Sequence, residues 1–370
     1  MYFFAILFIL LVVIILNAHG KKDPVSRDQI SHKRSFSKEF CEPDEVFVMR
    51  TEIENVSSHP MTRVCLKHTL DDTFVPTDDC PYTAVKNSNK LMLIGKTHVP
   101  AKDTGVFDVQ LSIGRRGVHH SQSIAVDCMD FSGFHITYYN QPSTEKIIIL
   151  PRRVNHSFMS KMIAQGYGDF NAKRGFIDDE TTVRAYGEYT GHEPMRHINW
   201  KKSAQVGDFV VKQFEPMGTF VTTIVFDITG FTYTKPGSMA YELLEYAISM
   251  LREMFEYFES KRIPYRLYTN AKSPHIQECV FSSDSSGKKS RNKMLLMLGE
   301  LEAAPAKSRL LKSGELLDMA IKSSFRAPIA YLAPVKQASL NVTLKKLIKV
   351  KGLEIFEFYA ENYYKQQVKG

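Results

Sequence analysis

The spacing of apolar residues changes at about residue 216 of this 370-residue chain, and that change limits what the chain can fold into. Before it, short segments alternate, as in "VFDVQLSIG" at 106–114, where every second residue from Phe107 to Ile113 is apolar. A period of two predicts strands with one buried face. After it, continuous apolar runs alternate with segments of helical periodicity. We therefore predict two folded units of different class, as the length also favours.

The first unit is predicted at residues 41–150. Short apolar segments recur there, separated by clusters of Pro, Asn and Asp, at "EVFVMRTEI", "TRVCLKHTL", "KLMLIG" and "KIIIL". Evenly spaced short strands without an intervening helix pattern are typical of a β-sandwich of immunoglobulin-like type.

The second unit is predicted at residues 216–370. The run "TFVTTIVFD" ends at Asp227 and indicates a central strand buried on both faces. It precedes "AYELLEYAISMLREMFEYFES", whose apolar residues form one helical stripe, with Arg252 and Glu256 on the opposite, charged face. Further strands and helices alternate to the C-terminus. This order predicts βαβ crossovers and a mostly parallel sheet.

The first sixteen residues, "MYFFAILFILLVVIIL", are uncharged and apolar apart from the Tyr2 hydroxyl. We interpret residues 1–20 as a transmembrane anchor and residues 21–40 as a linker. Basic residues follow the apolar run, which predicts a single-pass cell-membrane protein with its body in the cytoplasm. The alternative is a cleaved secretory signal, because Ala18-His19-Gly20 has small residues at suitable spacing; no basic segment precedes the apolar run, however.

The net charge of +8 favours an acidic partner. Neither basic run, at 288–293 or 345–351, is interleaved with aromatic residues, so we predict no nucleic-acid partner. The five cysteines are odd in number and form no C-x-x-C pair, which favours reduced structural thiols. The alternative for Cys128 is a nucleophilic role in catalysis, because His119 and His120 lie nearby in the sequence.

The loop after the strand at 219–227 is where an open α/β sheet binds ligands. A metal-dependent adhesion site there uses Asp-x-Ser-x-Ser with a distant Thr and Asp, since Mg²⁺ prefers six oxygens. Asp227 and Thr229 fit the pattern, but Phe231 stands at the third oxygen position. We therefore predict no metal and no cofactor, with Asp227 and Thr229 as vestigial ligands and Asp227 bonded within the loop.

The segment "YGEYTGHEPMRHINWKKSA", residues 186–204, contains the only tryptophan. Two interpretations remain open. In one, it forms a polar network that joins the two domains, with Trp200 buried. In the other, which is compatible with the first, it presents a recognition surface, because Trp, Tyr and Arg are the usual anchors of interfaces. The candidate residues are Arg184, Tyr186, Gly191, Arg196, Asn199, Trp200 and Lys201.

This segment resembles the signature of the domain of unknown function 58 family, approximately R-x-Y-x-x-G-D-x-x-R-x-I-[DN]-W-K-x-[ST]-A-R followed by V-[KR]-x-[FY]-E. The match runs from Arg184 to Ala204 and on to Glu215, with the tyrosine at a shifted spacing. The flanking segments "GRRGVHH", "DFSGF", "ILPRRV" and "RLYTNA" are also similar to the family. His192 and Gln205 depart from it, standing where the family has Asp and Arg.

The resemblance implies a membrane-anchored protein with a von Willebrand factor type A-like domain. Members are often encoded beside MoxR-type AAA+ ATPases and transglutaminase-like membrane proteins, which are the implied partners. Members usually have two N-terminal spans, whereas this sequence shows one.

Together these observations predict an α+β multi-domain protein. It comprises a transmembrane helix, an immunoglobulin-like β-sandwich, a signature segment at 151–215 that bridges the domains, and a von Willebrand factor type A-like α/β domain. Its predicted function is non-enzymatic interaction or assembly at the membrane. The alternatives are an outward-facing metal-dependent adhesion protein and an uncharacterised hydrolase or transferase.

Overall fold

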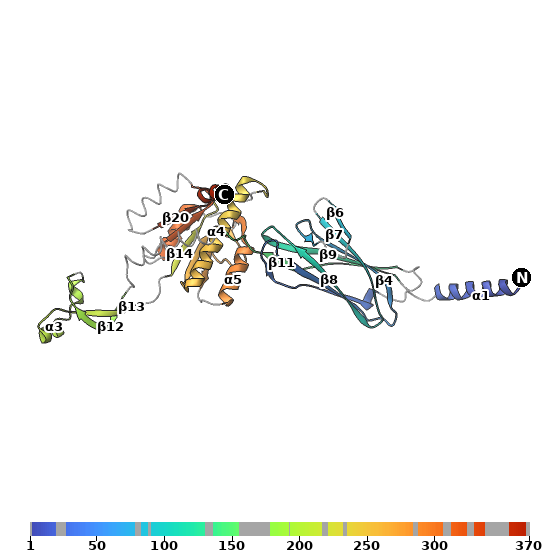
Figure 1. The fold of residues 1–370 in the computed structure, drawn as a ribbon, viewed down its shortest axis with the longest axis horizontal. Coiled ribbons are helices and arrows are strands. Elements are labelled where there is room, and N and C mark those ends of the chain that lie inside the picture. The colour runs from blue at the N-terminus through green and yellow to red at the C-terminus, as the bar shows by residue number, and fades with distance from the viewer. Residues whose placement is uncertain are drawn as a thin grey trace. The chain divides into compact units, whose positions relative to one another are not determined.

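The computed structural model describes residues 2–19, 27–77, 83–87, 90–129, 136–154, 178–191, 193–216, 221–231, 235–283, 288–305, 312–323, 329–336 and 355–367. The chain divides into two compact units, Met1–Arg152 and Arg153–Gly370 (Figure 1). The finer division predicted above, into anchor, linker, sandwich, bridge and α/β domain, stays a prediction.

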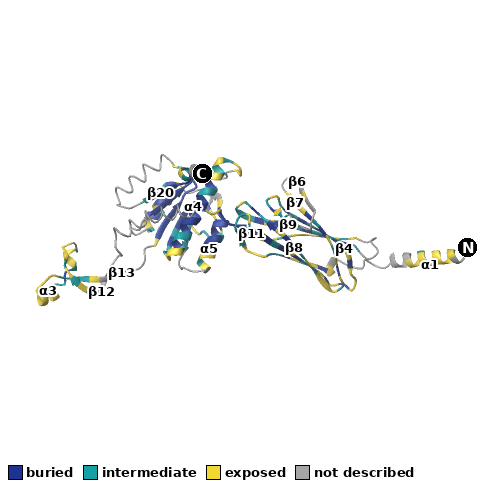
Figure 2. Ribbon diagram, in the orientation of Figure 1, coloured by how far each residue is buried: buried dark blue, intermediate teal, exposed yellow. Residues whose placement is uncertain are grey.

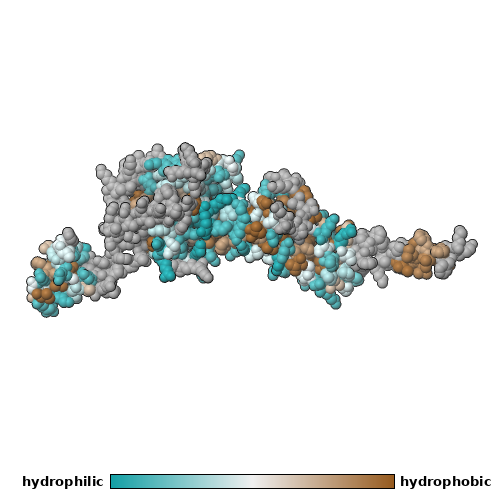
Figure 3. All heavy atoms as spheres, in the orientation of Figure 1, coloured by the Kyte–Doolittle hydropathy of each residue, from teal (hydrophilic) through white to brown (hydrophobic). Residues whose placement is uncertain are grey.

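Helix α1 (Tyr2–His19) contains the apolar N-terminal run, and its described side chains are largely exposed (Figure 3). Across the described part of the chain, no helix has both the length and the apolar character that a membrane crossing requires. The predicted transmembrane helix was therefore wrong, and so was the single-pass cell-membrane localisation with a cytoplasmic body.

The first unit contains two β-sheets. One has the order β1-β3-β8-β5, and the other has the order β2-β11-β9-β4-β7-β6 with β10 also paired to β9. The strands are β1 (Ile30–Phe36), β2 (Phe40–Cys41), β3 (Phe47–Asn55), β4 (Met61–Asp71), β5 (Val75–Pro76), β6 (Thr83–Asn87), β7 (Lys90–Val99), β8 (Asp103–Ser112), β9 (Gly117–Met129), β10 (Ile136–Pro142) and β11 (Lys146–Ile149), after the short 3₁₀ helix η1 (Arg27–Gln29). All described pairings are antiparallel except β2 with β11.

The two sheets pack face to face, because each apolar cluster between them takes residues from both. One cluster includes Met49 of β3 and Leu70 of β4, and the other includes Ile53 of β3 and Leu66 of β4. Polar side chains lie between the clusters on the same strands. Figure 2 shows the buried residues running along the inside of this unit. The core is therefore a β-sandwich interrupted by a polar layer.

That layer consists of Arg34 on β1, Thr51 on β3 and His68 on β4, each at least 96% buried. Arg34 and Thr51 are direct cross-strand neighbours. Arg34 Nη2 donates to Nδ1 of His68 over 2.7 Å, so this histidine nitrogen is the acceptor. Burial and the adjacent guanidinium lower the pKa of His68 to about 3, and burial lowers the pKa of Arg34 to about 10. At neutral pH a charged arginine thus faces a neutral histidine.

The second unit is built on a five-stranded sheet with the order β17-β15-β14-β19-β20. β14 is parallel to both its neighbours, β19 is parallel to β20, and β17 runs antiparallel at the edge. The strands are β14 (Thr222–Phe226), β15 (Tyr265–Thr269), β17 (Val280–Ser283), β19 (Ile329–Ala333) and β20 (Ile355–Tyr359); β16 (Ala271–Lys272) pairs separately with β18 (Glu302–Pro305). Every residue of β14 and β19 is buried, as expected for central strands covered on both faces.

Among the described residues, four helices accompany this sheet: α4 (Met239–Lys261), α5 (Lys288–Gly299), α6 (Ser313–Ser323) and α8 (Ala360–Gln367). Helix α6 packs on Val225 and Tyr331, while α4 contacts β19 and α8. Ser238 caps the start of α4, since its Oγ accepts a hydrogen bond from Tyr241 N. Arg262 caps the end of the helix with a φ of 55°.

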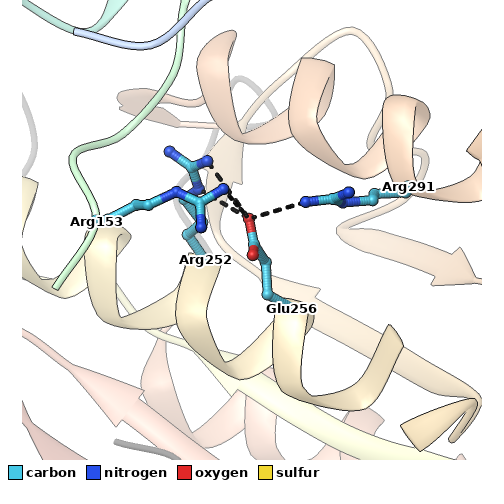
Figure 4. A network of polar contacts seen from close by, with 4 residues as sticks. All are labelled: Arg153, Arg252, Glu256 and Arg291. Atoms are coloured by element: carbon cyan, nitrogen blue, oxygen red, sulfur yellow. Dashed lines mark hydrogen bonds and ion pairs between the residues drawn. The ribbon is translucent and has the colours of Figure 1, made fainter. Parts of the chain in front are cut away.

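Part of the charged face of α4 is buried. Arg252 is completely buried and Glu253 is 2% exposed, although both lie off the apolar stripe. Arg153, a hundred residues earlier, reaches this face. Helical periodicity identified the apolar face of α4, but the charged face also contacts residues remote in sequence, namely Arg153 and Arg291 of α5 (Figure 4).

The remaining elements of the second unit are β12 (Asp178–Glu188), η2 (Met195–His197), α3 (Trp200–Val206) and β13 (Val210–Pro216). Strands β12 and β13 pair antiparallel in a separate two-stranded sheet. We call residues 178–216, as described, the β12–β13 module.

The predicted fold class was wrong in its specific form. The structure is a mixed α/β protein with several sheets; it contains no transmembrane helix within the described residues, and it does not show a von Willebrand factor type A-like fold. That assignment was implied by the signature resemblance, and the loop after β14 lacks the third oxygen ligand because Phe231 stands there. What the structure shows is a β-sandwich and a separate, mostly parallel α/β sheet.

We predict that His68 makes the β-sandwich sensitive to acid. The unfolded chain protonates this histidine below its ordinary pKa of 6.5, whereas the folded chain resists protonation down to about 3. Stability is therefore fully present above pH 6.5 and falls as the pH decreases, by about 1 kcal/mol per unit. His68→Gln keeps an acceptor for Arg34 but does not titrate, so its pH dependence should be shallower. Hydrogen exchange of β4 and β9 amides between pH 7 and 5, corrected for intrinsic rates, measures the difference; parallel profiles would contradict it.

Candidate functional sites

The first candidate site lies at the carboxyl ends of the parallel strands. The sheet order places the topological switch point between β14 and β19, where open α/β sheets bind ligands. Asp227 follows β14 directly, Asn270 follows β15, and Ser313 begins α6. Tyr331, within β19, directs its hydroxyl to the same point. The fold thus collects polar side chains from four separate segments, which we call the Asp227 corner.

Four hydrogen bonds converge on the Asp227 carboxylate. Oδ1 accepts from the Thr229 backbone N–H at 2.9 Å, from Thr229 Oγ1 at 2.6 Å and from Asn270 Nδ2 at 2.9 Å. Oδ2 accepts from the Tyr331 hydroxyl at 2.7 Å. Asp227 is 1% exposed and Tyr331 is fully buried. Burial, together with the charge of Asp227, raises the pKa of Tyr331, so the phenol remains a proton donor.

The hydroxyl of Thr229 is also fully engaged. It donates to Asp227 and accepts from Asn270 Nδ2 at 3.0 Å and from Ser313 Oγ at 3.2 Å. The carboxylate and hydroxyl oxygens that would ligate a hard cation are thus directed at protein donors, which repel a cation. The arrangement fits a structural carboxylate better than a metal site. Within the described residues, no cluster of three or more His, Cys, Asp or Glu side chains is placed to hold a metal.

The second candidate site is the β12–β13 module, whose local structure follows from a few side chains. Asn199 caps α3, because its Oδ1 accepts from Lys202 N at 3.2 Å. The helix ends at Gly207, which has a φ of 83°. Ser203 Oγ donates to Asn199 O and accepts from Val210 N, each over 2.9 Å. The helix is therefore fixed to the start of β13.

The outer surface of the module is aromatic. Trp200 and Phe209 meet edge to face with ring centroids 6.0 Å apart, and Tyr189 contacts Phe209 at the same distance. The Lys202 ammonium lies 3.7 Å from the centroid of the Tyr186 ring. A hollow of about 370 Å³ opens here, and it is lined by Trp200, Ser203, Ala204, Gly207, Asp208 and Phe209. Figure 3 shows apolar patches set among polar surface on this module.

The interpretation of Trp200 as a buried residue was wrong: it is 58% exposed, and Phe209 is 53% exposed. Tyr186, Asn199, Trp200 and Lys201 lie together on the module with Arg196, whose Nε donates to His197 Nε2 at 3.3 Å. Arg184 lies within β12, and Gly191 has a φ of 91°, a conformation that favours glycine. His192 lies outside the described residues. Whether residues 151–215 bridge two domains stays a prediction.

Sequence reasoning missed Phe209 and Lys202. Phe209 directly precedes β13, and its position in the sequence gives no sign that its ring lies against Trp200. A lysine four residues before the helix end gives no signal of an aromatic contact with Tyr186, which is sixteen residues earlier. The Trp200–Phe209 contact depends on the attachment of α3 to the start of β13, and the Lys202–Tyr186 contact depends on the pairing of β12 with β13.

Cys128 is not placed as a nucleophile. It is buried on β9, its Sγ lies 3.5 Å from the Met61 sulfur, and burial raises the pKa of its thiol to about 12. The four described cysteines, Cys41, Cys65, Cys128 and Cys279, are free thiols. A thiol with so high a pKa contributes almost no thiolate at neutral pH.

Comparison with known proteins identifies no family. No family model and no curated protein matches the sequence. The resemblance to the domain of unknown function 58 family therefore stays a prediction.

Among solved structures, the chain is similar to a type II cohesin domain from the cellulosome of Acetivibrio cellulolyticus, at 12% identity and a TM-score of 0.24, over 32% of this chain and 95% of that domain. A cohesin module from a Clostridium perfringens family 33 glycoside hydrolase matches at 8% identity and a TM-score of 0.21, over 31% and 97%. A Listeria innocua β-glucosidase matches at 13% identity and a TM-score of 0.18, over 30% of this chain and 16% of that enzyme. Similarities this weak support no assignment of family or activity.

We predict that Asp227→Asn destabilises the second unit by about 2–4 kcal/mol, because an amide turns a donor toward groups that already donate. Asp318→Asn, on the exposed face of α6, is the matched control and should change stability by less than about 0.5 kcal/mol. Thermal unfolding of the full chain, followed by calorimetry, measures both. If Mg²⁺ stabilised the wild type and not Asp227→Asn, the carboxylate would be available to a cation after all.

Proposed function

We propose that this chain is a non-enzymatic interaction protein and that the aromatic surface of the β12–β13 module is its docking site. The observation that carries the proposal is the joint exposure of Trp200 and Phe209 around the hollow. Two large aromatic rings side by side in water are uncommon on a surface without a partner. Tryptophan and tyrosine are the side chains that most often dominate binding energy at interfaces.

The surroundings of the rings indicate the chemistry of the partner. Lys201 and Lys202 are exposed on α3 next to Trp200, and Arg196 is exposed on η2. Basic side chains around an apolar centre complement an apolar anchor with acidic neighbours. A protein segment that inserts one apolar side chain into the hollow and places carboxylates over the lysines fits this surface.

The signature resemblance supplies a specific candidate for this partner, a MoxR-type AAA+ ATPase, with a transglutaminase-like protein as the second. The link to these proteins is a proposal that rests on the resemblance alone. The docking surface rests on the structure and is tested independently of the partner's identity.

The metal-dependent adhesion alternative has less support, because protein donors occupy both oxygens of Asp227. The hydrolase or transferase alternative has no arrangement in its favour among the described residues, where the buried thiol of Cys128 is poorly placed to react. Binding is thus the function that the exposed aromatic geometry supports best.

Removal of either ring should weaken binding. We expect Trp200→Ala or Phe209→Ala to lower the affinity for the partner by at least about tenfold, since buried aromatic anchors contribute 2 kcal/mol or more. Tyr138→Ala is the control, because Tyr138 is equally exposed, at 59%, on β10 of the other unit. Binding of the full chain to the purified MoxR-type ATPase of the same organism, followed by biolayer interferometry, gives the affinities.

A photo-crosslinking residue at position 209 and another at position 138 test the surface without assuming the partner. A partner that crosslinks from 209, does not crosslink from 138 and is lost on Lys201→Glu with Lys202→Glu supports the docking surface. Equal crosslinking from both positions, or crosslinking that survives the charge reversal, contradicts it. Failure of the ATPase alone contradicts that candidate.

A further inference from the structure

The strongest remaining feature is the buried end of the Arg34 side chain inside the β-sandwich. Arg34 is 4% exposed, and its Nε and Nη1 atoms meet no hydrogen-bond acceptor in the part of the chain that the structure describes. Thr51, its direct cross-strand neighbour, is 1% exposed, and its hydroxyl has no partner there either. Buried donors are almost always bonded, because they have given up their bonds to water. These three atoms therefore indicate a place for an acceptor from outside the chain.

The contacts that Arg34 does make are with uncharged acceptors. Its Nη2 donates to His68 Nδ1 at 2.7 Å and reaches Ser123 O at 3.5 Å. Burial and the guanidinium lower the pKa of His68 to about 3 and also lower the pKa of His32 on the same strand, so both histidines are neutral at neutral pH. Glu145 acts on Arg34 in the favourable direction but accepts no hydrogen bond from Nε or Nη1. The guanidinium thus keeps a positive charge and two unbonded donors in the core.

The surroundings of the layer select the size and charge of a ligand. Apolar clusters flank it on the same strands, one with Met49 and Leu70 and the other with Ile53 and Leu66. A sulfate or phosphate ion would direct several oxygens at such side chains, which donate no hydrogen bonds, and would bury a second negative charge without a partner. A water molecule would bond the donors but leave the charge. A single-atom monovalent anion accepts from several directions and offsets the charge as well.

We propose that Arg34 and Thr51 form an internal binding site for a small monovalent anion of the chloride class, which stabilises the folded β-sandwich. Arg34 supplies the charge and N–H donors, and the Thr51 hydroxyl can rotate to donate to the anion. His68 holds the guanidinium in place through its bond to Nη2. An anion that binds the folded unit and not the unfolded chain raises the stability of the sandwich as its concentration increases.

Hydrogen exchange of the full chain at neutral pH tests the site. Sodium chloride is exchanged for sodium gluconate at constant ionic strength, and the protection of β1 and β4 amides is measured. Once chloride exceeds its dissociation constant, we expect about a tenfold gain in protection for each tenfold rise in chloride. Bromide should replace chloride, and the amides of α4 and α6 in the other unit should not respond. Equal protection in chloride and gluconate, or an equal response in both units, overturns the proposal.

Variants locate the effect. Arg34→Gln should abolish the chloride dependence, because it removes the charge. Thr51→Val keeps the shape of the side chain and should weaken the apparent chloride affinity by about tenfold, since it removes one donor to an ion. Arg50→Gln is the matched control and should leave the dependence unchanged, because Arg50 is exposed on β3 and pairs with Asp108. Thr51→Val keeps the test valid if Arg34→Gln fails to fold.

Anomalous scattering from crystals of the full chain grown in bromide shows the ion directly. We expect a bromide peak within hydrogen-bond distance of Thr51 Oγ1 and of Arg34 Nε or Nη1. A water molecule there at saturating bromide overturns the site, as does a chloride dependence that survives in Arg34→Gln or is unchanged in Thr51→Val. A bromide peak without any chloride dependence in solution indicates binding at crystal concentration only, which also contradicts the proposal.

Discussion

The arrangement of the parallel strands at their carboxyl ends depends on the carboxylate of Asp227. A buried carboxylate without partners costs many kcal/mol, so the fold has to bring donors to it. Those donors come from the loop after β14, from Asn270 after β15 and from Tyr331 in β19. The same four hydrogen bonds therefore hold three strands in register at their carboxyl ends and occupy the oxygens that a cation would need. The hydrogen bonds that stabilise the Asp227 corner are therefore the same ones that leave its oxygens poorly available to a cation.

Two buried arginines show how differently the chain compensates charge. Arg252 faces Glu256, an anion within one helical turn, although three guanidinium groups share that one oxygen. Arg34 faces His68, a neutral acceptor, and its Nε and Nη1 find no hydrogen-bond acceptor in the described part of the chain. A neutral histidine does not offset the charge of a buried arginine, and among charged groups Glu145 acts on Arg34 in the favourable direction. The charge of Arg34 also explains why protonation of His68, which would place two cations 2.7 Å apart, is so unfavourable.

The sequence predicted elements whose burial follows a local period. The alternation at 106–112 lies in β8, the apolar stripe at 244–258 faces inward on α4, and the run ending at Asp227 contains the fully buried β14. It failed where burial depends on residues far apart in the chain. Arg252 lies on the charged face of the helix pattern, yet it is fully buried, and Trp200, which the interpretation of a domain-joining network placed in the interior, is 58% exposed. The membrane anchor was predicted from an uncharged apolar run and the basic residues after it, but no helix among the described residues has the length and apolar character of a span.

The polar groups of the second unit divide into two kinds by how completely their hydrogen-bonding capacity is used. At the Asp227 corner each carboxylate oxygen meets donors at 2.6–2.9 Å, so a ligand would have to break good bonds to enter. Around Glu256 the contacts are longer, at 3.3–3.7 Å, and two of the three arginines are half exposed. On the β12–β13 module, Trp200 and Phe209 gain little from each other compared with what both would gain from a partner that excludes water. We therefore expect binding where contacts within the protein are weak. The Asp227 corner, which the sequence motif indicated first, would gain least from a ligand.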